Sequence, residues 1–590
     1  MLISPSDANR DLLHSRPLDV HTWSFFPQVN VFVNEIHEKY FKNNNQPEKD
    51  NGKHHLKKVL IDLYLAWSED PELCIAVDLN NNAYTKDTRY SKLHITKKTI
   101  PIIQSLAAFD LIDLVNGHFR RGGGKSFKAR MWPTGELIEY FKKAEFNQFY
   151  FSDGCYSAIS RKTSITTQDH SQTEFKSVNA DRECIILKKR NPNKKAKPKQ
   201  IPIPYEDNEN TIRMRSELMA FNGLLVRSHI TLGFLDSPYL EIRNYTQRGS
   251  YRLEGDQPDH LHQRVKRIPV NQYFKFTTRQ FSNQSWTQGG RFYGGWWQQI
   301  PSQYRPEIRI NNTPTTEIDY SGHHCVLLYA QKGINYWSDI GFDPYSLSIN
   351  ESDFFRGSLF DVETEKSPEQ MAEINRQCVK LLFNMLLNAE TEKAAFSAFR
   401  YKIRKDEPSW ADYINWNDED LYKITNWIKE KHSLIADHLG TGVGIKLQFV
   451  DSEITSKILK HFTDAEIVVL PIHDSYVVPE EYGEELRLVM EEFWREEIEK
   501  CGASSKVFDP IFQEEMETRP MVKQIGYHDE LFDPEEEGGG AEHKAMRLLR
   551  ANHPLSSRFM NEYMRFNAFS AEQGWQYNTS AYNFYKANYL

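Results

Sequence analysis

At 590 residues and 39% hydrophobic content, the chain is long enough for several domains with ordinary cores. No run of about 18 apolar residues appears, and the first residues lack the basic-then-apolar order of a secretory signal, so we expect a soluble, cytoplasmic protein with no membrane contact. The net charge of -8 excludes a global attraction to nucleic acid but permits a local basic channel. The six cysteines are scattered without a CxxC pair, which argues against structural zinc and favours a reducing compartment.

The N-terminal region, residues 1–150, is predicted to contain helices and one basic hairpin. Residues up to about 50 are polar and end in a linker-like stretch, and apolar residues at helical spacing begin after His55. A second helix is expected after Thr96 or Thr99, either of which could cap it, followed by an extended segment at Leu111 and a hairpin with Gly122–Gly124 at its tip.

This order resembles a winged helix-turn-helix module, a family that places a helix in the DNA major groove and the hairpin on the backbone. The resemblance implies nucleic-acid contacts from Lys97 and Lys98 near the helix start and from Arg120 and Arg121 on the hairpin. Winged helices also serve as protein-interaction modules, so that alternative stays open.

A basic block, KKRNPNKKAKPK at residues 188–199, holds seven basic residues and no acidic one. Such a block is usually a solvated connector, and beside nucleic acid it would add phosphate contacts that weaken with salt. Residues from about 209 read as a helix, Gly538–Gly540 mark a flexible break, and the last 45 residues or so read as helical.

Two carboxylates stand at the ends of apolar strands. Asp319 closes the strand of TTEIDYSGHH, and Asp474 lies between the two apolar runs of VVLPIHDSYVVPE. A buried acid loses hydration unless it is paired or binds a metal, so taken alone Asp474 is more often a satisfied structural residue than part of a site. If the fold brings both acids together, they repel each other unless cations lie between them, and two magnesium ions would allow in-line displacement at phosphorus.

Between the two acids, one helix presents a polar stripe. Arg376 and Lys380 are four residues apart, and Asn384 and Asn388 continue the same face. Two cations on one stripe could hold a nucleoside triphosphate, although such a stripe usually marks a solvated face.

In this order, the motifs resemble family A DNA polymerases, the bacterial polymerase I type. Gly290 and Arg291 match the family's GR, and Gln299 begins the match to the end of its QNIP motif. Asp319, Tyr320 and Ser321 match DYS. The remaining matches are Arg376 and Lys380 to RxxxK of the fingers helix, Leu447 and Gln448 to an IQ pair, and His473 and Asp474 to the HD of the last palm motif. Together the matches cover roughly residues 206–530.

The resemblance implies a set of roles for these residues. Asp319 and Asp474, with the carbonyl of Tyr320, would hold two Mg²⁺ ions, with Mn²⁺ as the alternative metal. Lys380 and His473 join the two aspartates as catalytic residues, with Lys380 assisting pyrophosphate departure and His473 positioning the primer end. Nucleotide contacts are implied for Arg376, Lys380, Tyr320, His324, Asn384, Asn388 and Tyr345, and primer or template contacts for Arg291, Gln299 and Gln448.

The sequence departs from the family at informative positions. His324 stands where the family has a glutamate that crowds the sugar 2′ position, and Asn384 and Asn388 replace aromatic residues of the fingers helix. Ser475 follows Asp474 as in the phage-type RNA polymerases that share this palm, which keeps RNA synthesis open. No acidic exonuclease pattern appears in the first 200 residues, so we expect no proofreading. Trp296 and Trp297 could stack on bases, but such residues more often belong to a core.

We therefore predict an α+β right-hand polymerase preceded by a winged helix-turn-helix domain. It would act on nucleoside triphosphates and a DNA primer and template, with RNA or single-stranded DNA as alternative substrates. The expected order is a nucleic-acid-binding domain (1–150), a basic connector (151–205), a thumb-like helical region (206–285), a first palm segment (286–350), fingers (351–440), a second palm segment (441–532) and a helical tail (533–590).

Two other functions stay open at this point. One is an RNA-synthesising, primase-like or template-independent nucleotidyltransferase on the same palm, and the other is a non-catalytic replication initiator or DNA-binding regulator. For the leading prediction, a template-directed DNA polymerase with an added nucleic-acid-binding domain, a plasmid, phage or other mobile element would be a fitting source.

Overall fold

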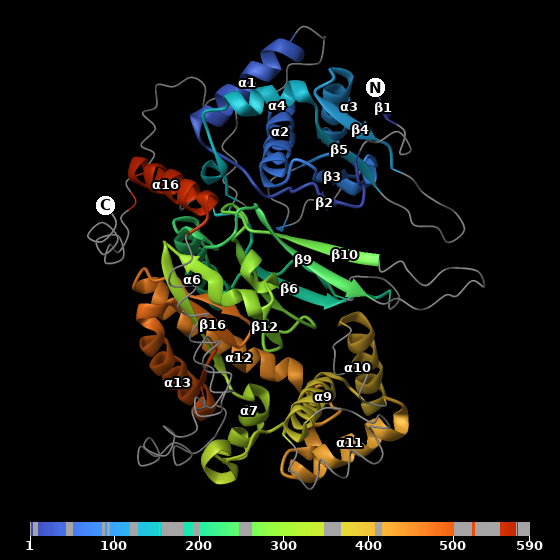
Figure 1. The fold of residues 1–590 in the computed structure, drawn as a ribbon, viewed down its shortest axis with the longest axis vertical. Helices are drawn as coiled ribbons and strands as arrows, with labels where there is room; N and C mark the ends of the chain where they lie inside the picture. The colour runs from blue at the N-terminus through green and yellow to red at the C-terminus, as the bar shows by residue number, and fades with distance from the viewer. Residues whose placement is uncertain are drawn as a thin grey trace, which may run out of the picture.

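The computed structural model shows a mixed α+β protein with a small N-terminal unit at one end of a larger body (Figure 1). None of the described helices is long and apolar enough to cross a membrane. The structure describes residues 2–3, 10–42, 51–84, 89–90, 95–117, 128–152, 154–155, 181–193, 200–246, 262–346, 367–406, 416–500, 522–525, 555–573 and 575.

The N-terminal unit, called the head below, comprises the described residues up to 152 and has its own apolar core. Its sheet has the strand order β1-β4-β5-β3-β2. The strands are β1 (Leu2–Ile3), β2 (Ser15–Pro17), β3 (Cys74–Val77), β4 (Ile112–Val115) and β5 (Ala129–Pro133), and the helices are α1 (Pro27–Tyr40), α2 (Asn51–Glu69), α3 (Thr99–Ala108) and α4 (Gly135–Lys143).

The head differs from the sequence prediction in two details. Helix α1 was not anticipated, although Val29, Val33 and Ile36 are fully buried at helical spacing. The N-cap of α3 is Lys98, whose side chain makes no capping bond. Thr96 Oγ1 instead accepts the Lys98 N–H at 3.2 Å, so the threonine supports the turn before the helix rather than the helix end itself.

The part of the body that follows the connector is richer in strands than predicted. A capping box between Asn208 and Thr211 starts helix α6 (Glu209–Val226). After it the chain forms β8 (Ile230–Leu232), β9 (Tyr239–Thr246), β10 (His262–Pro269) and β11 (Thr277–Phe281). The helical region predicted over 206–285 agrees with the structure over α6, and from Ile230 on the described residues form strands instead.

Two sheets of the body flank the region of the two aspartates. One sheet has the order β12-β11-β6-β7, with β6 (Ile185–Arg190), β7 (Gln200–Pro202) and β12 (Gly289–Gly294). The other has the order β15-β16-β14-β13-β8, and β17 (Val522–Ile525) also pairs with β14. Its further strands are β13 (Ile308–Ile310), β14 (Thr313–Tyr320), β15 (Leu470–Ile472) and β16 (Ser475–Pro479).

Helices pack around these sheets and extend from them. Helix α12 (Gly444–Asp464) lies against β12, and α7 (His323–Gln331) and α13 (Gly483–Lys500) lie beside each other near β14. Trp296 and Trp297 are 1% and 0% exposed, so they belong to the core and do not offer stacking surfaces. A helical group, α9 (Pro368–Asn388), α10 (Glu392–Asp406) and α11 (Asp418–Lys431), projects at the end of the body away from the head (Figure 1).

Helix α16 (Ser557–Glu572), near the end of the chain, joins the head to the body. Phe566 and Phe569 are buried in the head core, whereas Ser556 Oγ donates to the body carbonyl of Leu235 at 3.0 Å. Polar contacts also cross this junction, with Tyr273 donating to Glu69 at 2.7 Å and Arg267 pairing with Asp70 at 2.8 Å. The head is thus attached by an aromatic core and by ion pairs together.

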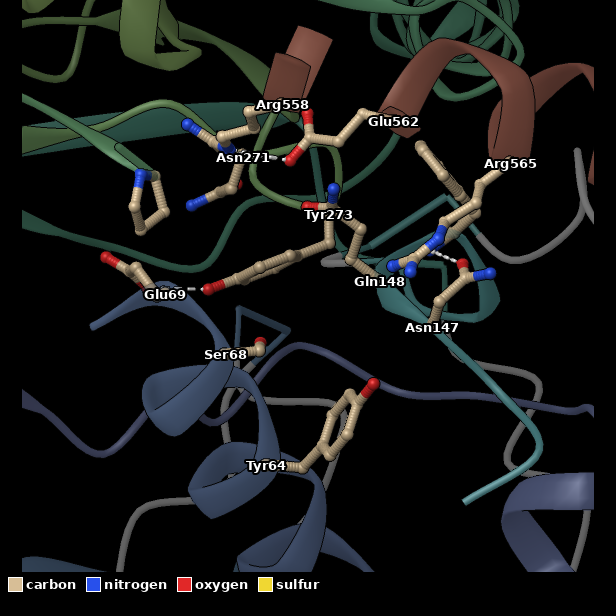
Figure 2. Close-up of a pocket in the computed structure, with 12 residues that line it drawn as sticks. Tyr64, Ser68, Glu69, Asn147, Gln148, Asn271, Tyr273, Arg558, Glu562 and Arg565 are labelled. Carbon is tan, nitrogen blue, oxygen red and sulfur yellow. Dashed lines mark hydrogen bonds and ion pairs between the residues drawn. The ribbon is translucent and has the colours of Figure 1, made fainter. Parts of the chain in front are cut away.

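A polar pocket of about 200 Å³ lies at this junction (Figure 2). Its wall includes Glu69 and Tyr273 on one side and Arg558 with Glu562 from α16 on the other. Since Tyr273 and Arg558 already bond to these carboxylates, the pocket's charges are largely matched within the protein.

Replacing Phe569 by alanine should lower the free energy of unfolding by about 3–5 kcal/mol, because the ring is 3% exposed and packs on Phe26, Tyr150 and Phe149. Urea unfolding measures this change. Met564 lies on the same helix but is 57% exposed, so Met564→Ala should change stability by less than about 0.5 kcal/mol. Equal effects of the two substitutions would contradict the role of α16 in the head core.

Candidate active site

The pairing of β14 with β16 brings Asp319 and Asp474 together. The two strands are antiparallel and Asp319 is the register partner of Ser475, the residue that follows Asp474. The carboxylates are close enough that the charge of Asp474 raises the pKa of Asp319. Residues separated by 155 positions in the chain are therefore neighbours at the end of one sheet.

The pKa values of this carboxylate pair are pushed apart. Burial and the neighbouring charge of Asp474 raise the pKa of Asp319 well above its ordinary value, and the charge of Lys380 opposes that rise. Burial also acts to raise the pKa of Asp474, but the nearby Arg291 guanidinium is part of what holds it below the ordinary value. Such repulsion between two acids is relieved by a bound cation, so the donor set is chemically suited to divalent metal ions.

Asp474 occupies a two-residue turn with His473. The flanking residues Ile472 and Ser475 are register partners, so His473 and Asp474 alone connect β15 to β16. His473 has φ of 61°, a left-handed conformation that is uncommon for residues other than glycine and costs free energy. Its exposed ring makes an edge contact with Tyr293, their centroids 6.2 Å apart.

A buried network of hydrogen bonds supports the turn between β15 and β16. Ser475 Oγ donates to Glu317 Oε1 at 2.6 Å, and Arg305 also donates to that carboxylate oxygen. Glu317 lies two residues before Asp319, so both side chains are on the same face of β14. Burial raises the pKa of Glu317, while Arg305 and the Ser475 hydroxyl oppose that rise. Ser475 therefore has a bracing role in this chain.

Arg291 forms an ion pair that the sequence interpretation missed. Its Nε donates to Asp451 Oδ2 at 2.6 Å, and its Nη2 donates to His324 Nε2 at 3.2 Å. Asp451 is fully buried on α12, and burial raises its pKa to about 7 although Arg291 opposes this. Burial and the same arginine lower the pKa of His324 to about 3, so its imidazole is neutral. An acid in the apolar run of α12, three residues after Gln448, was the available sequence signal for Asp451.

Gln298 ties the aspartate turn to the neighbouring sheet. Its Nε2 donates to the carbonyls of Phe292 and Pro471 at 3.1 and 3.0 Å, and its Oε1 accepts the Gly294 N–H at 3.1 Å. Pro471 belongs to β15, which leads into the turn. Gln299, the residue singled out from the sequence, is exposed, and its side chain makes no hydrogen bond within the described part of the chain.

The two cations of helix α9, Arg376 and Lys380, lie near Asp343 and Tyr345 of the segment after α7. Arg376 Nη2 and Nε donate to Asp343 Oδ2 at 2.8 and 3.1 Å, so this arginine has a protein partner. Lys380 is exposed, with its ammonium 5.9 Å from the centroid of the Tyr345 ring. The charge of Lys380 also acts on Asp319, where it opposes the rise in the pKa of that carboxyl. The second cation of the stripe is thus electrically coupled to the carboxylate pair.

The other predicted site residues fall into different environments. Gln448 Nε2 donates to Asn388 Oδ1 at 3.1 Å, which joins α12 to the end of α9. Asn388 in turn donates to the Asn384 carbonyl at 2.8 Å. The Tyr320 side chain is buried and donates to the Met490 carbonyl at 2.6 Å, and Tyr345 is buried against Phe383.

On the head, Lys97 and Lys98 are both exposed at the start of α3. Arg120 and Arg121 lie outside the described residues, as does the predicted hairpin tip at Gly122–Gly124.

Compared with known proteins, the chain matches no protein-family model and no curated protein. The likeness to family A polymerases consequently rests on its motifs and on the chemistry of the residues around them.

Gln298→Ala should lower the free energy of unfolding by about 1–3 kcal/mol, since it leaves the Pro471 and Phe292 carbonyls and the Gly294 N–H without their partner. Gln299→Ala is the matched control and should stay within about 0.5 kcal/mol of the wild type. Chemical denaturation of both variants measures the difference. A loss of stability in Gln299→Ala equal to that in Gln298→Ala would argue against a stabilising role for the Gln298 hydrogen bonds.

Proposed function

We propose that this chain is a template-directed DNA polymerase that adds nucleotides to a primer 3′ end by two-metal-ion phosphoryl transfer. The observation that carries the proposal is the register of β14 and β16, which makes Asp319 and Asp474 neighbours. The charge of Lys380 acting on Asp319 supports it further, because a cation near the carboxylates suits a triphosphate bound through metal ions. A right-hand arrangement of palm and fingers follows from the same proposal.

Asp319 and Asp474 are the residues that would hold Mg²⁺, with the Tyr320 carbonyl as a further ligand. In phosphoryl-transfer sites this ion is bound by one or two carboxylates, with substrate phosphates and waters as the remaining ligands, so a small protein donor set is sufficient. The metal ions would supply charge neutralisation at the reacting phosphate.

The protein's own side chains would orient the nucleotide. Lys380 is exposed and available to the triphosphate, whereas Arg376 shares its Nε and Nη2 with Asp343 and keeps Nη1 for phosphate. Arg291, fixed by Asp451, would face the primer end as a positioned donor. His473, exposed on its strained turn, would lie beside that end with Tyr293.

A ribonucleotide-using enzyme on the same palm is the second candidate. One observation favours it: His324 is a neutral imidazole held by Arg291, at the position where the resembled family has a sugar-crowding glutamate. Supplying ribo- and deoxynucleotides separately, with a primed template and with an unpaired strand, separates templated DNA synthesis from RNA synthesis and from terminal transfer.

Asp319→Ala and Asp474→Ala should each reduce nucleotide incorporation by at least about 10³-fold, because each removes a ligand of the metal ions, while binding of primed DNA changes little. Primer extension with Mg²⁺, and its loss with a chelator, measures this. Asp437→Ala removes a carboxylate that is 66% exposed on the surface and should retain full activity. Extension by both site variants at the wild-type rate would refute the proposed function.

We also propose that the head is a winged-helix nucleic-acid-binding module. Support comes from its element order, α2, β3, α3, β4 and β5, and from the strand order β4-β5-β3 within its sheet. Removing residues 1–150 is a poor test, because Phe566 and Phe569 of α16 are buried in the head core and would become exposed.

Alanine at both Lys97 and Lys98 should instead weaken duplex binding and reduce its salt dependence by up to about two units of slope, one for each lost phosphate contact. Basal extension of a primed template should persist. The double variant Lys142→Ala with Lys143→Ala, on the exposed end of α4, is the matched control. Unchanged duplex affinity and salt dependence in the Lys97 and Lys98 variant would remove α3 from the binding surface.

A further inference from the structure

A large groove lies between the helical group and the edge of the β6–β7 sheet. Its volume is about 760 Å³, and its walls come from β6, β7, the turn between β11 and β12, the end of α9 and the start of α12. Arg190, Asn388 and Lys446 in these walls are exposed, so the groove is accessible to a large ligand. The sequence interpretation assigned no role to most of these residues.

Primary amides dominate the chemistry of the groove. They are contributed by Gln200, Asn283, Gln284, Gln288 and Asn388. Gln200 Oε1 and Asn283 Oδ1 are buried atoms that have no hydrogen-bond partner in the described part of the chain. An unmatched buried acceptor costs free energy, so these two amides are polar groups that the protein's own contacts leave incompletely satisfied.

The amide-bearing turn is held in a defined, strained shape. Asn283 and Gln284 have φ of 55° and 58°, both left-handed. The Gln284 N–H donates to the Lys188 carbonyl at 2.7 Å, and Asn283 Nδ2 donates to Gln288 Oε1 at 2.9 Å. The turn thus presents its amides from a fixed backbone and not from a freely rotating loop.

The groove has two exposed cations, Arg190 and Lys446, that could bind an anionic partner. Arg190 on β6 pairs with Glu390 at the end of α9, and both side chains are more than 60% exposed, so the pair is weak. Lys446 is a second exposed cation on the α12 side. A phosphate that reached Arg190 would compete with Glu390 for the guanidinium.

The groove is connected to the carboxylate pair through α12. Asn388 in the groove accepts from Gln448, and Asp451, one turn further along α12, accepts from Arg291. Arg291 in turn lowers the pKa of Asp474. The groove and the candidate active site therefore share helix α12 in their walls.

We infer that this groove binds a single strand of nucleic acid, with the amides contacting base edges and Arg190 and Lys446 contacting phosphates. The inference deepens the proposed function and rests on it, because it names the partner that would supply the template. An amide offers both a donor and an acceptor, so it suits any base, and base edges are free for such contacts only where the strand is unpaired. No aromatic side chain lines the described groove, so base edges and not base faces are the feature recognised.

The test measures binding of a fluorescein-labelled 20-nucleotide single strand of mixed sequence to the full-length protein. Fluorescence anisotropy in the presence of a chelator reports the bound fraction. Arg190→Ala and Lys446→Ala should each weaken binding several-fold at low salt and reduce the salt slope by about 0.7, the value for one lost phosphate contact on a single strand. Glu390→Gln should tighten binding, because it frees Arg190. Gln200→Ala should weaken binding without changing the salt slope.

Arg213→Ala is the matched control, since Arg213 pairs with Glu217 on the exposed face of α6, outside the groove. Wild-type affinity in Arg190→Ala, Lys446→Ala and Glu390→Gln would overturn the inference. A loss of affinity for duplex but not for the single strand would overturn it as well, in favour of a duplex groove.

Failure of this inference differs from failure of the proposed function. Binding is measured without metal and without nucleotides, so it does not depend on catalysis. If the groove is wrong but the polymerase is right, the groove variants bind normally and Asp319→Ala still abolishes incorporation. If the proposed polymerase function is wrong, neither the wild type nor any variant incorporates nucleotides, whatever effect the groove variants have on strand binding.

Discussion

The repulsion between Asp319 and Asp474 is the constraint on which the candidate site depends. Antiparallel pairing fixes their separation, since a one-residue shift of β16 would turn Asp319's neighbours to the opposite face of the sheet. The surrounding groups limit the cost of this pair. Arg291 offsets the charge of Asp474, and Lys380 offsets that of Asp319. Each of these cations comes from a different element, so the balance exists only in the assembled fold.

The residues that hold the carboxylate pair in place make defined hydrogen bonds of their own. Asp451 fixes Arg291, and Gln298 fixes the strand before the turn. The left-handed His473 is a strained residue in a two-residue connection, and such strain persists only where neighbouring contacts hold it. A catalytic arrangement needs this kind of support, because small displacements of charged groups have large effects on rate.

The elements around the site were predictable from the sequence to the extent that their patterns are local. The apolar runs around Asp474, the strand ending near Asp319 and the helix bearing Arg376 and Lys380 all occur where periodicity indicates them. Partners distant in the chain were not predictable. Nothing near Arg376 in the sequence identifies Asp343 as its partner, and the choice of Gln298 over Gln299 depends on which side chain faces β15. The strands after α6 were missed because their alternation is short and interrupted by polar residues.

The attachment of the head bears on how the whole chain could work. Glu69 and Asp70 at the end of α2 bond to Tyr273 and Arg267 of the body, and α16 adds its aromatic face to the head core. Glu69, Asp70 and Tyr273 are all buried at this junction, so burial of the aromatic rings and of these hydrogen-bonded polar groups holds the head against the body together. A head fixed in this way would present any nucleic acid it binds in one orientation relative to the carboxylate pair. The distance between the head and the carboxylate pair would then be set by the fold and not by the length of a flexible linker.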